Sequence, residues 1–437
     1  MTKQQIAPRF NQPQDLPTVN GAQLRIIGNA ADQVKKHYAI NSQNPLFSAA
    51  PTTTQAVPYK QPLLNTTPQN KSYYQTNNFA QIAQLEQKAN SDITPIYGNI
   101  TAQGQAAWTL VEDPKSGQQY YMSWSQYGSV WTYTQSITPS TEAQLAADPT
   151  TTYQAVVQFG TYSQTSSVAG IHSYNLGLTT MVVESVVALI LAKCMSSFIA
   201  DGLGFLVSQF AIRLTQAAAE LGFESFSFAV PEFLIGAVAG CLCFAIVFIG
   251  IAYLWNWLNR LYTLRVQVFN WDTNYNWQLT SQGFSNAVNP GQDSNQTQLG
   301  ITLDKMVSAG GVVYPPGFSP VTPLDSVCYY AVIIYENDQT FAEGASFAIQ
   351  SIRNNDTTQG FTYAFNCPRF ADNGQYVVNS VVDPTTFLTT AESKWVSTPQ
   401  TQTIQVTSDN TPVTVSFDYL EGASDDTYNI NININQS

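Results

Sequence analysis

Apolar and polar residues follow different patterns in four consecutive parts of the chain. Residues 1–95 are rich in Gln, Asn, Pro, Thr and Ala and carry little periodic apolar signal, which is typical of a polar, loosely ordered arm. One short helix is expected within it, because Phe79, Ile82, Leu85 and Ala89 follow helical spacing. We expect that helix to pack on a neighbouring domain.

Residues 96–176 change to aromatic and β-branched residues broken by turns, which is the composition of short strands. The clearest element is a hairpin. Trp108 leads into a turn at Asp113, and Tyr121 belongs to the returning strand. This part of the chain is therefore predicted to be a small β-subdomain.

The middle part, residues 177–262, contains the longest apolar run of the chain. Phe233 to Trp255 is 23 residues without a charge, and a helix of that length spans the ~30 Å hydrocarbon core of a bilayer. Aromatic residues at its end, followed by Arg260 and Arg265, would supply an interfacial belt with basic flanks. We predict that this segment enters a membrane. The alternative is a buried central helix of a soluble domain.

Two weaker helical segments precede it, Leu178 to Ile199 and Leu203 to Leu221. Charged residues interrupt both, and the second carries polar residues at three- and four-residue intervals opposite an apolar face. A charge at the centre of a solitary spanning helix costs about 3 kcal/mol unless it is paired or faces water. Both segments therefore suit a helical bundle that exchanges protein contacts for lipid.

Residues 263–437 return to short apolar and aromatic runs separated by turns, which predicts a β-sandwich. The tail alternates Ile with Asn after Tyr428 and suits an edge strand. The whole chain is thus expected to have an α+β fold. In that fold a central hydrophobic helical hairpin or bundle is flanked by the small N-terminal β-subdomain and the C-terminal antiparallel β-sandwich, which would serve recognition.

Composition excludes several classes of function. The formal net charge is −12 with only 17 Lys and Arg, so no basic surface for nucleic acid is expected. Two His and five Cys leave little material for metal or nucleophilic chemistry, and no P-loop, GxGxxG, HExxH or GxSxG motif stands in a suitable context. We expect neither enzymatic activity nor a cofactor or metal. Cys328 and Cys367 could pair in an oxidising compartment.

Three groups of residues are candidates for contact with lipid, with a pore or with a glycan. The membrane-inserting candidates are Phe233, Leu234, Ile235, Leu242, Phe244, Ile246, Val247, Phe248, Ile249, Ile251, Leu254 and Trp255. The candidates for a pore or bundle interior are Glu184, Lys193, Asp201 and Arg213. The candidates for lipid or glycan contact are Trp271, Tyr275, Trp277, Tyr314 and Phe318, whose apolar bodies and polar edges suit a headgroup layer or a sugar ring. For this last group, ordinary sandwich core with a turn is the alternative.

The order of these parts resembles that of helical pore-forming toxins, in which a concealed hydrophobic hairpin or bundle is joined to β-domains. The stretch VFNWDTNYNW, which begins at Val268, is similar to the opening strands of actinoporin- and aegerolysin-like sandwiches, which bind membrane lipids. The resemblance implies docking on a lipid headgroup or a surface glycan, insertion into the bilayer and assembly into a homo-oligomer. The first residues contain no apolar signal segment, so we expect secretion by another route and action on a target-cell membrane.

A second interpretation makes the middle part a permanent anchor of an integral membrane protein. The two β-regions would then be parts of a surface or virion structure, and detergent would be needed to extract the protein. A soluble carbohydrate-binding module and an enzyme are the remaining classes.

Overall fold

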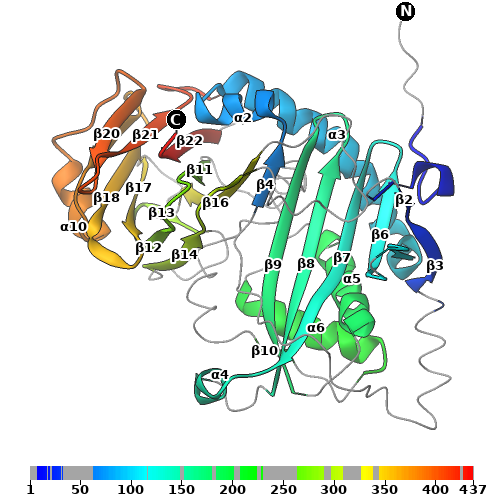
Figure 1. Ribbon diagram of the computed structural model, residues 1–437. Coiled ribbons are helices and arrows are strands. Elements are labelled where there is room, and N and C mark those ends of the chain that lie inside the picture. The colour runs from blue at the N-terminus through cyan, green and yellow to red at the C-terminus, as the bar shows by residue number, and fades with distance from the viewer. Residues whose placement is uncertain are drawn as a thin grey trace, which may run out of the picture.

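The computed structural model describes residues 7–16, 18–19, 22–30, 32, 63–115, 117–147, 152–179, 184–200, 207–223, 228–229, 263–289, 297–308, 326–337, 344–423 and 427–436. Figure 1 shows long strands with helices beside them in one part of the molecule, and a layered part built from the last third of the chain.

Most of the described strands belong to one large sheet. Its order is β20-β21-β22-β11-β16-β4-β9-β8-β7-β6-β5-β3, with β10, β13 and β15 paired off this path. Their bounds are β3 Arg25–Asn29, β4 Leu63–Thr66, β5 Thr109–Glu112, β6 Gln119–Ser125, β7 Gly128–Pro139, β8 Tyr153–Ser163, β9 Val168–Leu178, β10 Phe228–Ala229, β11 Thr263–Asn270, β13 Ala287–Val288, β15 Val307–Ser308, β16 Ser326–Asn337, β20 Thr401–Val406, β21 Thr411–Phe417 and β22 Thr427–Ile434. Strands β11 and β22 pair in parallel, with Val266 opposite Ile430. Because β22 also pairs with β21, the edge strand expected for the tail is wrong: the tail forms an inner strand. A separate two-stranded ribbon joins β1 (Thr18–Val19) to β2 (Ala22–Gln23).

Strand β4 connects the two halves of the large sheet. On one side Leu64 lies opposite Cys328 of β16, and on the other side it lies opposite Gly170 of β9. This strand comes from the part of the sequence that shows little apolar periodicity. Four residues are too few for alternation to identify a strand.

A five-stranded sheet covers the C-terminal half of the large sheet. Its order is β14-β12-β17-β18-β19, with β12 Trp277–Ser285, β14 Gln298–Leu303, β17 Ala345–Arg353, β18 Asp356–Cys367 and β19 Gly374–Val378. Aromatic side chains fill the space between the sheets. The rings of Tyr335 and Phe347 stack at 4.5 Å between centroids, and those of Phe365 and Phe417 meet edge to face at 5.3 Å. The β-rich fold therefore fits the predicted sandwich.

The hairpin predicted after Trp108 is confirmed. Strands β5 and β6 are antiparallel, with Thr109 opposite Met122. The Asp113 carboxylate accepts a hydrogen bond from the Lys115 backbone N–H at 2.9 Å, and Gly117 takes a φ of +72°, a value that suits glycine.

The described helices are α2 Pro68–Gln75, α3 Phe79–Gln103, α4 Glu142–Ala147, α5 Glu184–Ala200, α6 Val207–Glu220 and α10 Pro384–Ala391, together with the short 3-10 turns η1 Pro13–Asp15 and η2 Gly104–Ala107. The helix expected at Phe79 begins there, where the Asn78 side chain accepts from the Gln81 backbone N–H. It runs on to Gln103 because Ile93, Ile96 and Ile100 continue its buried face.

The expected α+β fold with a central helical hairpin or bundle is wrong for the part of the chain that is described. Strands dominate that part, and the long apolar helix α5 lies against strands of the large sheet and against α3. Apolar periodicity does not distinguish a helix that packs on other helices from one that packs on a sheet. Among the described residues, no helix is both long and apolar enough to cross a bilayer.

Two smaller predictions remain, and the structure tests one of them. Cys367 is a free, buried thiol, so it does not form the disulfide considered for it. The division of the chain at residues 95, 176 and 262 stays a prediction.

Asp418, at the end of β21, makes the stability of the sandwich depend on pH. Burial raises the pKa of this carboxyl from 3.8 to about 6, against the hydrogen bonds that Asn429 donates to it. The folded chain therefore holds this proton more tightly than the unfolded chain. The protonated Asp418 carboxyl therefore stabilises the folded state fully below pH 3.8. This stabilisation is lost as the pH rises through about 6.

We expect Asp418→Asn to flatten this dependence. The thermal unfolding midpoint of the wild type should fall by more than that of the variant when the pH is raised from about 4 to about 7. Equal falls in the two proteins would show that Asp418 does not carry the effect.

Candidate functional site

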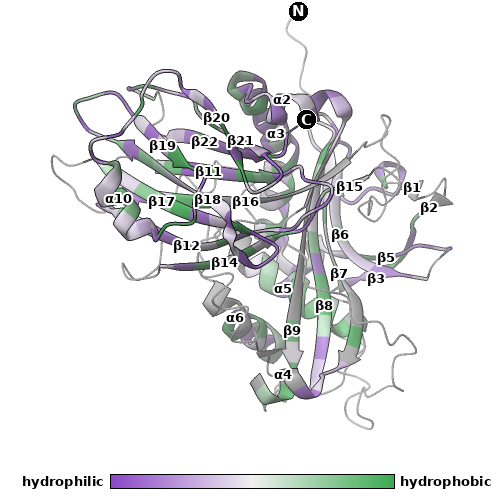
Figure 2. Ribbon diagram, turned by 60° about the vertical axis from the view of Figure 1, so that its left-hand side comes forward, coloured by the Kyte–Doolittle hydropathy of each residue, from purple (hydrophilic) through white to green (hydrophobic). Residues whose placement is uncertain are grey.

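One stretch of helix α5 is buried on every side. Val186, Ala192 and the five residues between them are each 2% exposed or less. Seven consecutive residues make almost two helical turns, so no face of this stretch meets water. The helix contacts β6, β7 and β8 as well as α3, α6 and η2. Figure 1 shows it beside the long strands, and Figure 2 shows its hydropathy in a second view.

Few polar contacts hold α5 to the sheet in the described structure. Thr132 of β7 donates to the Ala188 carbonyl at 3.2 Å, and the Trp108 indole N–H donates to the Ser196 hydroxyl at 2.7 Å. The remaining contacts of residues 186–192 are made by apolar side chains. Their burial is favourable in any apolar surroundings and does not depend on one particular partner.

Helix α6 is amphipathic and covers part of α5. Leu214, Ala217 and Ala218 are buried, whereas Ile212 is 58% exposed.

A charge pair joins the two helices. The Lys193 ammonium lies 2.8 Å from the Glu220 carboxylate, and the lysine side chain is three-quarters buried. Cys194 adjoins this pair: burial raises the pKa of its thiol, while the field of Arg213 lowers it and that of Glu220 raises it. Lys193, Glu220 and Arg213 thus lie near Cys194, where the two helices meet.

The structure places only some of the predicted pore or bundle residues. Lys193 and Arg213 lie on α5 and α6, and Glu184 is the first residue of α5. Asp201 falls outside the described residues. The sequence did not identify Glu220 as the partner of Lys193, because the contact joins two helices across an intervening segment.

The predicted membrane-inserting residues, Phe233, Leu234, Ile235, Leu242, Phe244, Ile246, Val247, Phe248, Ile249, Ile251, Leu254 and Trp255, all lie outside the described residues. Their role stays a prediction.

The aromatic candidates for lipid or glycan contact lie in different surroundings. Trp271 and Trp277 are buried, and their indole N–H groups donate to Asn433 and Asp272. They would reach a ligand only if the sandwich opened. Tyr275 is half-buried beneath the Arg353 guanidinium, 4.1 Å from the ring centroid. Tyr314 and Phe318 lie outside the described residues, and the contact predicted for this group is untested.

The sequence predicted Arg265 as a basic flank of the apolar run, a role that the described residues do not test. Arg265 lies in β11, where it is buried and forms a bidentate ion pair with Glu86 of α3. A partner 179 residues away cannot be inferred from local sequence.

Comparison with known proteins does not show a family for this chain. No family model and no curated protein matches it. Among solved structures, the lipid binding protein Nakanori aligns at a TM-score of 0.26 with 10% identity, over 40% of this chain and 71% of its own. IP-1A from Alcaligenes faecalis aligns at 0.21 with 11% identity, over 40% of this chain and 91% of its own. Likenesses this low decide neither fold nor function.

Proposed function

We propose that this protein binds lipid bilayers and permeabilises them by transferring apolar helices from its own core into the lipid. The observation that carries the proposal is the stretch of α5 from Val186 to Ala192, which is apolar on every side and which few polar contacts attach to the sheet. Hydrocarbon is as apolar as the protein core, so lipid can replace most of what α5 touches.

The ion pair between Lys193 and Glu220 lowers the cost of such a transfer. A lone charge at the centre of a bilayer costs about 3 kcal/mol, whereas paired charges that move together offset each other. Because one partner lies on α5 and the other on α6, the two charges would enter the membrane together and stay paired. Inserted copies would line a pore with these polar groups and assemble as a homo-oligomer.

The sequence downstream of α6 supplies the longest candidate for insertion. The 23 residues from Phe233 to Trp255 contain no charge and reach across a hydrocarbon core when helical. We infer that the protein is secreted, meets a target-cell membrane, and acts there without catalysis.

Release of a dye from lipid vesicles tests this function. The full chain, purified without detergent, is added to loaded vesicles beside two variants, Leu242→Glu in the uncharged run and Gln405→Glu at an exposed position of β20. A glutamate at the bilayer centre costs about 3 kcal/mol, so we expect Leu242→Glu to release dye at least about tenfold more slowly. The wild type and Gln405→Glu should release it equally fast.

Three results would count against the proposal. Release by Leu242→Glu at the wild-type rate, with an unchanged thermal midpoint, would show that the uncharged run does not enter the lipid. If the wild type released no dye, the protein would not permeabilise bilayers. A chain that can be extracted only with detergent would favour the alternative, a resident membrane-anchored surface or virion protein.

A further inference from the structure

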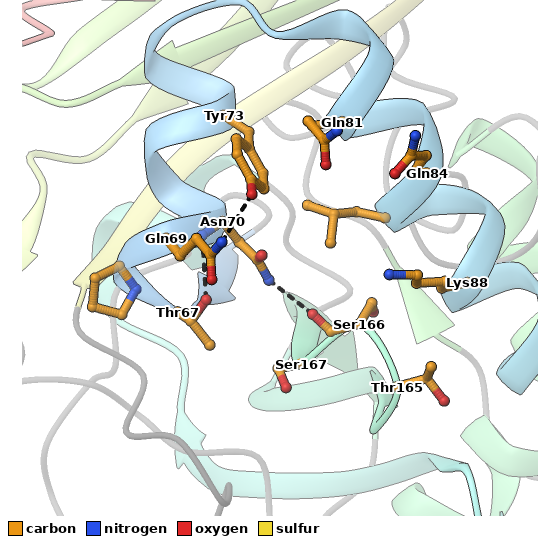
Figure 3. Close-up of a pocket in the computed structure, with 12 residues that line it drawn as sticks. Thr67, Gln69, Asn70, Tyr73, Gln81, Gln84, Lys88, Thr165, Ser166 and Ser167 are labelled. Carbon is orange, nitrogen blue, oxygen red and sulfur yellow. Dashed lines mark hydrogen bonds between the residues drawn. The ribbon is translucent and has the colours of Figure 1, made fainter.

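A second polar site lies away from the α5–α6 pair, in a hollow between α2, α3 and the turn that joins β8 to β9. Its volume is about 490 Å³, within the range of small-molecule sites. The residues that line it are Thr67, Pro68, Gln69, Asn70, Tyr73, Gln81, Gln84, Leu85, Lys88, Thr165, Ser166 and Ser167. We call it the Lys88 hollow. Figure 3 shows Lys88 and the two glutamines of α3 on one side, with Asn70 and the hydroxyl groups of the turn facing them.

The floor of the hollow is held in place by buried groups. The Asp92 carboxylate accepts hydrogen bonds from the Ser163 hydroxyl at 2.7 Å and from the backbone N–H and hydroxyl of Thr165, both at 2.9 Å. The Asn70 amide donates to the Ser166 carbonyl at 2.8 Å. Asn70 and Asp92 are both at least nine-tenths buried, so the turn is fixed before any ligand arrives.

Burial raises the pKa of Asp92, and the bonds from Ser163 and Thr165 oppose that rise. This carboxylate serves the turn, and it does not line the hollow.

Several lining groups have hydrogen-bonding capacity to spare. Within the described residues, the side chains of Gln81, Gln84 and Lys88 make no hydrogen bond or ion pair. Side-chain amides and hydroxyls each donate and accept, as sugar hydroxyls do. The Tyr73 ring, whose hydroxyl accepts from Gln69 at 3.0 Å, adds an aromatic face.

The charge of the lining residues limits the class of ligand further. Among the described residues that line the hollow, Lys88 is the only charged one and no carboxylate faces it, in a protein whose formal net charge is −12. A cation beside neutral donors and acceptors suits a ligand with many hydroxyls and one negative group.

We propose that the Lys88 hollow binds an acidic saccharide, whose carboxylate pairs with Lys88 and whose hydroxyls bond to Gln81, Gln84 and the hydroxyls of the turn. The inference stands apart from the proposed membrane insertion, because saccharide binding can be measured without lipid. Failure of one leaves the other intact.

Titration calorimetry of the full chain with sialyllactose, lactose and inorganic phosphate tests the proposal. We expect sialyllactose to bind at least tenfold more tightly than either of the other two. Lys88→Gln should weaken it by about tenfold or more, the effect of losing a hydrogen bond to a charged group. Gln84→Glu should weaken it by a similar factor, because a glutamate four residues before Lys88 pairs with it along the helix. The matched control is Lys305→Gln, at an exposed position outside the hollow.

The variants at positions 84 and 88 change exposed side chains of α3, so their thermal midpoints should match the wild type. If lactose bound as tightly as sialyllactose, the negative group would have no role in recognition. If phosphate bound as tightly as sialyllactose, the hollow would recognise an anion and not a saccharide. No binding of sialyllactose, or unchanged binding by Lys88→Gln, would overturn the proposal.

Discussion

Arg265→Met is expected to lower the free energy of unfolding by about 3–5 kcal/mol, because it leaves the Glu86 carboxylate buried without its partner. The two groups form a bidentate pair. One guanidinium nitrogen lies 2.8 Å from one carboxylate oxygen of Glu86, and a second nitrogen lies 2.7 Å from the other oxygen. A buried carboxylate that loses such a partner must either stay charged in a poor solvent or take up a proton.

The pair occupies the junction between the two halves of the molecule. Glu86 belongs to α3, which packs on the long strands β6, β7 and β8, and Arg265 belongs to β11 in the C-terminal half of the sheet. Arg265 also reaches the Asn429 side chain at 3.4 Å, next to the hydrogen bonds of Asp418. Loss of the pair should therefore weaken the contact between α3 and the C-terminal strands.

Denaturant unfolding with matched variants measures this effect. Arg25→Met removes an arginine that pairs with Glu112 at the surface, and it should change the midpoint little, because exposed ion pairs contribute little. The double variant Glu86→Leu with Arg265→Met should be more stable than Arg265→Met alone, since no buried charge remains. A loss no larger than that of Arg25→Met would contradict the account of the buried pair.

Local elements of the fold could be predicted from the sequence. The hairpin after Trp108 follows from turn residues between two aromatic runs, and the start of α3 at Phe79 follows from apolar spacing. The many short strands after residue 263 indicate a sandwich for the same reason. Each of these signals lies within about 20 residues of sequence.

Contacts between distant segments could not be predicted. Strand β11 pairs in parallel with β22, and β4 pairs with both β16 and β9. Each of these pairings joins segments far apart in the chain, and no local pattern encodes them. The pair of Arg265 with Glu86 and the pair of Lys193 with Glu220 were missed for the same reason. Helix α5 shows a further limit, because a largely apolar helix has the same sequence pattern whether a sheet or lipid surrounds it.

A fluorescent label on α6 reports directly whether the helix pair enters lipid. Ile212 is 58% exposed, so Ile212→Cys can be labelled with an environment-sensitive dye without disturbing the core. Cys241, Cys243 and Cys328 are first replaced by alanine. Cys194 and Cys367 are buried and can stay, since burial raises the pKa of both thiols, that of Cys367 to about 12. The matched control carries the label at Gln405→Cys, on the exposed side of β20.

Addition of vesicles that contain a quencher within the acyl chains measures directly whether α6 enters the lipid. We expect the label at position 212 to shift to the blue and to be quenched, while the label at position 405 keeps the emission it has in water. A label at position 212 that stays water-like on vesicles to which the protein is bound would contradict transfer of the helix pair into the bilayer.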